Sequence, residues 1–168
     1  VMAFSDDLIR AVVKTGGFSD PAAEKYLGDV LIQRRDKIGR AYLAKINPVV
    51  DPTLDASGVL SFGNAAVQYG VTSAPRGYTA AWHTFDNATA ETRPLGQTTG
   101  AQSPMTAPAG LPGAMGAYIR VDISADHPDH PTWKEPVRAY FQRQSAGWKL
   151  VGLERLPEPT QARQKEAR

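Results

Sequence analysis

The stretch "PVRAYFQRQSAGWKLVGLERL", residues 136–156, decides the fold class, because it reads as two short strands joined by a tight turn. Side chains along a strand point alternately to opposite faces of the sheet. Small residues between the two alternating runs favour a β-hairpin. The expected apolar face of the first strand is Val137, Ala139 and Phe141, the turn is Ser145, Ala146 and Gly147, and the face of the return strand is Trp148, Leu150 and Gly152.

Upstream of this hairpin, short extended runs alternate with Gly, Pro and Asn, which is typical of strands and turns. Residues 59–71 predict one strand or a bent pair, and residues 77–85 predict a strand that ends at the turn formers "DNAT". Residues 91–100 would return beside it, with Pro94 at an edge or a bulge. Residues 100–116 read as a long connection, and "AYIRVDISA" reads as the next strand.

The first third of the chain has a helical period instead. Ser5 precedes "DDLIRAVVKTG" as an N-cap, and acidic residues in a first turn suit the helix dipole. In the second helix Asp20 is the cap and Pro21 takes the first position, where no N–H is needed. This helix is expected to reach about Ile46. Its apolar positions recur every three or four residues: Tyr26, Leu27, Val30, Leu31, Ile38, Tyr42 and Ile46.

These patterns predict an α+β fold, in which an N-terminal helical hairpin precedes a mainly antiparallel β-sheet or small β-sandwich of about five to seven strands. The expected boundaries are residues 1–50 for the helical hairpin and 51–157 for the β-domain. Residues 158–168 are polar and interrupted by proline, so they predict a disordered tail. The helical hairpin needs a surface to cover. We expect Leu27, Val30 and Leu31 to pack on the sheet or on a module outside this chain.

Composition restricts the function more than it identifies one. Lys and Arg number 19 against 17 Asp and Glu, a net charge of +2, which is too small to indicate nucleic acid as the partner. The absence of cysteine excludes a thiol nucleophile, a cysteine zinc site and a disulfide framework. Apolar runs are too short for membrane insertion, and the first residues have no cationic leader. Because the chain opens on Val1, we expect it to be part of a longer protein.

Several strings of the sequence are distinctive: "FSDPAAEKYLGDVLIQRRDKIGRAYL", "NPVVD", "WHTFDNAT", "HPDHPTW" and "GWKLVGLER". With them the chain resembles the C-terminal region of a group of large, uncharacterised bacterial proteins, over nearly its whole length. The part upstream of this region in such proteins resembles a kinase-like fold with a "DFGS"-type stretch, and nothing of that kind stands here. The resemblance implies that any catalytic centre lies upstream, and it assigns no functional residue to this chain.

The stretch "DISADHPDHPTW", residues 122–133, holds two of the three histidines. Prolines between and after them prevent His127 and His130 from sharing a helix face, and the spacing matches no zinc or EF-hand pattern. The favoured interpretation is a stiff surface connection in which Asp126 and Asp129 bind turn amides and Trp133 closes the edge of the core. A metal or ligand loop and acid/base catalysis are the alternatives. No cofactor is predicted.

His83, in "AAWHTF", shares a face with Ala81 and Phe85, so a packed and hydrogen-bonded histidine is favoured over a catalytic one. Asp86 and Asn87 fit a tight turn that needs side chains tolerant of positive φ. Calcium binding at that turn is the alternative. The triplet that begins at Asn87 is a formal glycosylation sequon, which means little in a chain of bacterial character.

Two further groups of residues are candidates for binding. Basic residues on the long helix favour a solvated surface, or a contact with an upstream module through arginine; they are Arg34, Arg35, Lys37 and Arg40. Tryptophans exposed together would form a sugar-stacking platform, although burial in the core is favoured for them; they are Trp82, Trp133 and Trp148.

Three functional hypotheses follow. The first is a non-catalytic accessory or interaction domain of a larger bacterial protein, with the N-terminal module of that protein as its partner. The second is a β-sandwich that binds carbohydrate or another ligand. The third is a fragment of an enzyme whose catalytic centre lies upstream. No nucleophile motif is present, which favours the first hypothesis.

Overall fold

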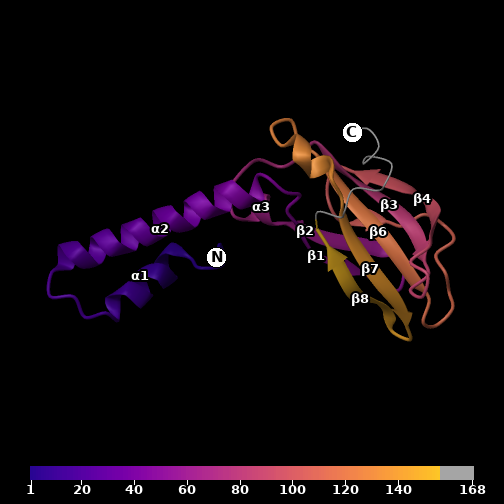
Figure 1. Cartoon of the computed structure of the whole chain (residues 1–168), viewed down its shortest axis with the longest axis horizontal. Coiled ribbons are helices and arrows are strands. Elements are labelled where there is room, and N and C mark those ends of the chain that lie inside the picture. Colours follow the sequence, from indigo (N-terminus) through magenta and orange to yellow (C-terminus); the bar gives the residue numbers. More distant parts are fainter. Residues whose placement is uncertain (156–168) are drawn as a thin grey trace.

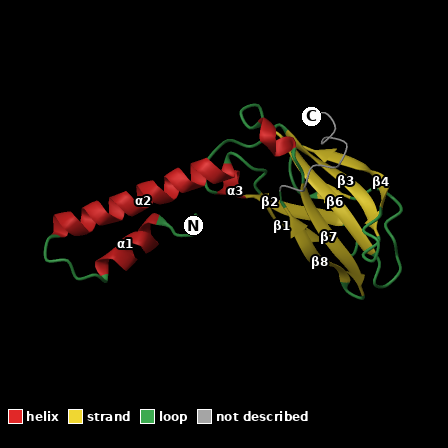
Figure 2. Cartoon of the chain, viewed as in Figure 1, coloured by secondary structure: helices red, strands yellow, loops and turns green. Residues whose placement is uncertain are grey.

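A computed structural model describes residues 1–155, and the predicted disordered tail lies outside this range. The fold is α+β, with helices first and two antiparallel sheets after them, as the sequence predicts. Figure 1 shows the helical hairpin standing out from one end of the layered sheets, and Figure 2 shows the same separation of helix from strand. The two layers enclose one apolar core between them.

The hairpin consists of α1 (Asp6–Lys14) and α2 (Pro21–Leu43). Both predicted caps are confirmed, because the side chain of Ser5 accepts the N–H of Leu8 and that of Asp20 accepts the N–H of Ala22. An ion pair of 2.7 Å between Arg10 and Asp29 joins the two helices. The helix ends at Leu43 and not at Ile46, since the backbone turns before the buried Asn47 and Pro48.

Eight strands lie within the described residues, more than the sequence predicted. A three-stranded sheet has the order β1-β2-β5 and a five-stranded sheet has the order β4-β3-β6-β7-β8. The strands are β1 (Val49–Leu54), β2 (Val59–Asn64), β3 (Gly77–Phe85), β4 (Thr92–Gly100), β5 (Met105–Thr106), β6 (Tyr118–Asp126), β7 (Val137–Gln144) and β8 (Gly147–Glu154).

Two short helical elements complete the chain, α3 (Ala65–Gln68) and the 3-10 helix η1 (Pro131–Lys134). The run from 59 to 71 is therefore a strand followed by a helix and not a bent pair of strands. Asn64 makes the change, because its side chain accepts the N–H of Val67 and so caps α3. The predicted connection 100–116 also contains β5, which pairs with β2.

The closing hairpin β7–β8 forms as predicted, with one irregularity. Tyr140 lies opposite Gly152, whereas Phe141 lies opposite Leu150, so Val151 is an extra residue in β8. Gly152 therefore does not share a face with Trp148 and Leu150, and the prediction that it does is wrong, because a bulge reverses the alternation.

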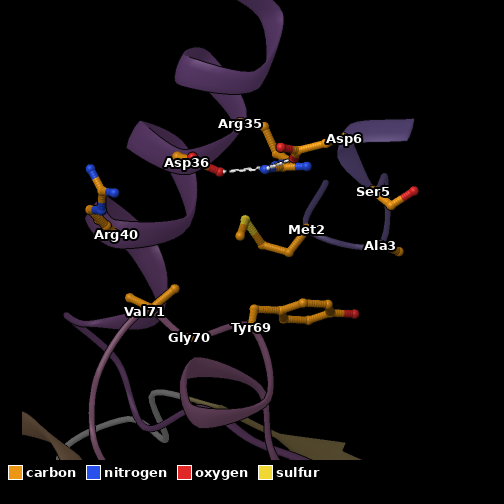
Figure 3. Close-up of a pocket in the computed structure, with 10 residues that line it drawn as sticks. All are labelled: Met2, Ala3, Ser5, Asp6, Arg35, Asp36, Arg40, Tyr69, Gly70 and Val71. Atoms are coloured by element: carbon orange, nitrogen blue, oxygen red, sulfur yellow. Dashed lines mark hydrogen bonds and ion pairs between the residues drawn. The ribbon is translucent and has the colours of Figure 1, made fainter. Parts of the chain in front are cut away.

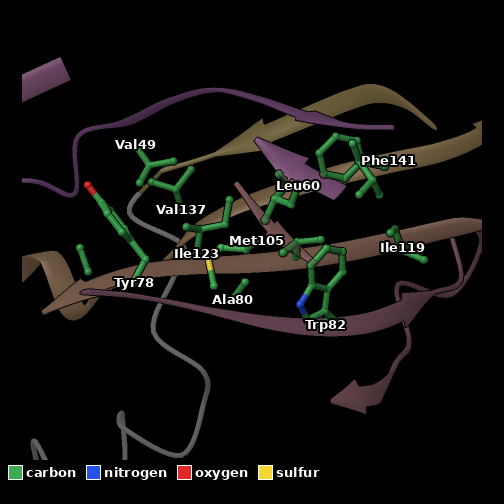
Figure 4. Packing of buried hydrophobic residues seen from close by; sticks show 14 of the residues in the cluster. Val49, Leu60, Tyr78, Ala80, Trp82, Met105, Ile119, Ile123, Val137 and Phe141 are labelled. Atoms are coloured by element: carbon green, nitrogen blue, oxygen red, sulfur yellow. The ribbon is translucent and has the colours of Figure 1, made fainter. Parts of the chain in front are cut away.

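The core lies between the two sheets (Figure 4). Alternate residues of the central strands point into it, as in β6, where Ile119, Val121 and Ile123 are fully buried. The largest fully buried side chains are Trp82, Trp133, Phe141 and Leu60. Each polar N–H of these tryptophans has a partner: Nε1 of Trp82 donates to Thr98, and Nε1 of Trp133 donates to the carbonyl of Ala44.

The connection between α2 and the β-domain is centred on Asn47, which is 5% exposed. Its side-chain amide donates to the carbonyls of Ile123, Trp133 and Glu135, at 2.9, 3.2 and 3.1 Å. The guanidinium of Arg155 donates to the carbonyl of Asn47 itself. One buried amide thus ties the end of the helical hairpin to β6 and to the segment around η1.

Candidate functional site

The two histidines of the "HPDHPTW" loop converge on one hydroxyl. Nε2 of His127 lies 3.3 Å from Oγ1 of Thr72, and Nε2 of His130 lies 3.2 Å from the same oxygen. The two imidazole rings are 4.5 Å apart, and the ring of His130 stacks on Trp133 at 4.9 Å. Thr72, in the loop after α3, is a member of this cluster that sequence reasoning missed, because it lies 55 residues from His127.

The hydrogen bonds of His127 fix its tautomer. The backbone N–H of Asp129 donates to Nδ1 of His127 at 3.1 Å, so the neutral ring carries its proton on Nε2. That N–H faces two acceptors, Oγ1 of Thr72 and the carbonyl of Ser73. A metal ion needs a lone pair on the ligating nitrogen, and neither nitrogen of His127 offers one here.

The surroundings of His130 shift its pKa downward. Burial lowers the pKa of His130, and the neighbouring His127 lowers it further, while Asp129 raises it. A hydroxyl that accepts from His127 is free to donate to Nε2 of His130, so a chain of hydrogen bonds runs through Thr72. Within residues 1–155, no group of three or more His, Asp or Glu side chains is placed to hold a metal ion.

The aspartates of this loop do not bind turn amides, contrary to the sequence-based prediction. The side chain of Asp126 lies 3.4 Å from Nζ of Lys134 and 3.9 Å from the guanidinium of Arg76. The turn amide that needed an acceptor, that of Asp129, uses the ring of His127 instead. Trp133 is fully buried, so the expectation that it closes the core edge is confirmed.

His83 lies on the outer face of the five-stranded sheet, because its neighbour Trp82 points into the core. Its Nδ1 is buried without a hydrogen-bond partner among residues 1–155. Burial lowers the pKa of His83, and the adjacent charge of Arg120 lowers it further, while hydrogen bonds with the backbone of Arg120 and Ala81 raise it. His83 and Arg120 are opposite each other in neighbouring strands.

An ion-pair network that sequence reasoning missed spreads over the same face. Nε of Arg120 lies 2.8 Å from Oδ1 of Asp122, Arg138 lies 3.9 Å from Asp122, and Arg138 also lies 3.4 Å from Glu154. Positive and negative groups alternate across three strands, which holds the strands in register. Polar residues at every second position of β6 and β7 were the sequence pattern from which this network could have been predicted.

The turn after β3 is held by Asp86. Its Oδ1 accepts the N–H groups of Ala88 and Thr89 at 2.8 and 3.2 Å, and these bonds lower the pKa of its carboxyl group, that of Ala88 most. The positive φ of the turn belongs to Ala90, at 60°, and not to Asp86 or Asn87 as predicted. Asp86 and Asn87 line an open groove of about 660 Å³ with Glu91, Arg93 and Tyr118.

The three tryptophans do not form a common surface. Trp82 and Trp133 are fully buried. Trp148 is partly buried against the core, and the guanidinium of Arg143 lies 5.4 Å from its ring centroid. In the register of the closing hairpin, Trp148 lies opposite Arg143.

The basic residues of α2 point in different directions. Arg35 is 13% exposed and makes ion pairs with Asp6 and Asp36 at 2.7 and 2.8 Å. It lines a cleft of about 480 Å³ between the hairpin and the loop after α3 (Figure 3). Arg40 lines the same cleft, across from Tyr69, while Arg34 lies on another side of the helix and Lys37 is exposed.

Apolar side chains cover one side of the helical hairpin and face solvent. A groove of about 330 Å³ runs between α1 and α2 and is almost entirely apolar. Leu31, which we expected to pack on a surface, is 37% exposed here, and the hairpin does not lie on the sheet (Figure 1). Packing of this stripe on the sheet of the same chain is therefore excluded. The groove is lined by Val1, Phe4, Ile9, Val12, Leu31, Arg34, Arg35 and Ile38.

Comparisons with known proteins add no assignment. No protein-family model, no curated protein and no solved structure matches this chain. Among the described helices, none has the length together with the apolar character that crossing a bilayer would require.

Proposed function

We propose that this chain is a non-catalytic interaction domain of a larger bacterial protein and that its helical hairpin docks on the N-terminal module of that protein. The observation that carries the proposal is the uncovered apolar side of the hairpin. Val1, Phe4 and Val12 are 68%, 53% and 57% exposed, and they lie beside Leu31 and Ile38. Contiguous apolar patches of this kind mark interaction sites in soluble proteins.

The construction of the hairpin also supports docking. Its two helices are joined by the Arg10–Asp29 ion pair, and the N-terminal segment is tied to α2 by a hydrogen bond from Arg35 to the carbonyl of Phe4. Met2 packs directly on Gly39, where a side chain would collide with it. The hairpin therefore keeps its own shape without a covering surface, and a partner meets a preformed groove.

The other two hypotheses have less support. Exposed tryptophans would have favoured carbohydrate binding, yet two of the three are inside the core. The Thr72–His130 pair resembles a hydroxyl with its base, but His130 is oriented by stacking on Trp133 and lines none of the three cavities described above. A catalytic group needs a place for its substrate.

Amide hydrogen exchange tests the proposal. The rates of α1 and α2 are compared between this chain alone and the complete parent protein. Docking predicts slower exchange in the parent for both helices, with no change in the core strands β3 and β6 as the internal control. Equal exchange rates of α1 and α2 in the two proteins would contradict the proposal.

A further inference from the structure

The apolar stripe of α2 has the spacing of a helix–helix seam. Leu27, Leu31, Arg34 and Ile38 follow one another at intervals of four, three and four residues. Residues at these intervals line one side of a helix and pack against a second helix. Val12 and Phe4 line the opposite side of the groove. A third helix would pack between these residues and the stripe of α2.

Arg34 is a charged residue within this apolar seam. Its side chain makes no hydrogen bond or ion pair with any of residues 1–155. The other guanidinium at the groove, that of Arg35, is already neutralised by Asp6 and Asp36. A helix that covered the seam would take Arg34 out of water, and an unpaired buried charge is strongly unfavourable. The occupant must therefore bring a carboxylate to this position.

From these two features we infer that the groove binds a single amphipathic α-helix, which has apolar residues at three- and four-residue spacing and an Asp or Glu facing Arg34. The inference rests on the proposed function, and the N-terminal module supplies the helix. From Leu27 to Ile38 the seam covers about 17 Å, which a helix of ~14 residues spans. A polar pair inside such a seam fixes the register and selects the partner.

Two synthetic peptides test the inference. Both are about 21 residues long, with leucine at seam spacing on an alanine- and glutamine-rich host, and they differ at one seam position, which is Glu in one and Lys in the other. Binding is followed by the amide NMR shifts of the complete, isotope-labelled chain. The Glu peptide is expected to shift amides of α1 and α2 but not of β6, and to bind roughly tenfold more tightly than the Lys peptide.

A charge exchange provides the control. Arg34→Glu should reverse the preference, so that the Lys peptide binds more tightly. Arg40→Glu, which lies on the cleft side of α2, should keep the original preference. Ile38→Ser should weaken both peptides while the circular dichroism spectrum stays unchanged, because Ile38 is already 44% exposed.

Equal binding of the two peptides, or no shift in α1 and α2 at millimolar peptide, would overturn the inference. A chain that sediments as a dimer with α2 protected from exchange would overturn it too, since a second copy would then occupy the groove. If exchange in the parent protein shows α1 and α2 covered while the peptides fail, the proposed function stands and only the helical partner is wrong. If exchange shows that α1 and α2 are uncovered in the parent protein, the proposed function and the inferred helical partner are both wrong.

Discussion

His127 and His130 show how two similar residues acquire different chemistry from their surroundings. The ring of His127 is 2% exposed and has both nitrogens engaged, one as the acceptor of a backbone N–H. The ring of His130 is only partly buried, and its Nε2 faces the hydroxyl of Thr72. The sequence predicted that the histidines lie in a structural loop. It did not predict their contact with Thr72, because no local pattern indicates that the loop after α3 lies next to them.

Zinc or calcium should therefore leave the melting temperature of the chain unchanged. A cation that bound the native state alone would raise the melting temperature by mass action. Nε2 of His127 carries its proton toward Thr72 and Ser73, so it is not available as a ligand. Thermal unfolding with and without metal checks this. A rise that disappears in the His127→Ala, His130→Ala double variant would show that the loop binds metal.

Acidification below pH ~6.5 should destabilise the chain through His130. Burial and the neighbouring His127 lower the pKa of His130 in the folded state, whereas the unfolded ring titrates near pH ~6.5. The unfolded state therefore takes up the proton first. The stability contributed by the neutral ring is complete above pH ~6.5 and is lost as the pH falls through the folded pKa.

Urea unfolding at pH 7.5 and pH 5 measures this loss, and the His130→Gln variant should lose less stability than the original chain. His83→Gln is the matched comparison, because burial also lowers the pKa of His83, on a different face. The carboxylates with lowered pKa, such as Asp86, do not interfere, since their effect begins below pH ~4. If the original chain and the His130→Gln variant lose the same free energy of unfolding between the two pH values, the pH dependence comes from other groups.

At the level of helices and strands, the confirmed predictions are those that rest on a single local residue preference, such as a helix cap or a proline. The caps Ser5 and Asp20 are confirmed, and so is the position of Pro94 in an edge strand beside a bulge. The strand β1 was missed because Pro48 and Pro52 hide its alternation, and its pairing with β2 is irregular between Val50 and Thr53. Irregular pairing depends on the partner strand, which a local pattern does not contain.

Gly152→Val should lower the free energy of unfolding by roughly 1–3 kcal/mol. A Cβ atom at Gly152 would lie 3.3 Å from Cδ2 of Tyr140, which is itself hydrogen-bonded to Glu154. The added branch would have to displace that ring next to the bulge. Chemical denaturation measures the change, and Gly113→Val, at a glycine with open space around it, is the control. A loss equal to that of the control would exclude the steric explanation.

For the whole molecule, the β-domain encloses its own core whereas the hairpin is uncovered. Leucine-to-alanine substitutions should therefore cost more stability in the β-domain than on the hairpin. Leu60→Ala should cost about 2–5 kcal/mol, because Leu60 is fully buried between the sheets. Leu31→Ala should cost clearly less than Leu60→Ala in this chain, because Leu31 is already 37% exposed and its removal leaves no enclosed cavity. Denaturation of both variants in the same buffer tests the contrast.

In the complete parent protein the same Leu31→Ala substitution should have a larger effect, if the docking proposed above buries that side chain. A large loss in the isolated chain would instead mean that Leu31 packs within it. The general class of the fold was predictable from alternation and caps, whereas the direction of the hairpin was not. That direction depends on the tertiary contacts of Asn47, whose partners lie 76 to 88 residues away.

The junction at Asn47 has a mechanical consequence. The helix that it anchors has 23 residues, so it is a lever of about 34 Å, and a rotation of about 10° at its base moves the far tip by about 6 Å. Such a displacement exceeds the rise of one helical turn and would shift a docked helix out of register. The buried hydrogen bonds of Asn47 therefore determine how precisely the far end of the hairpin is positioned against a docked helix.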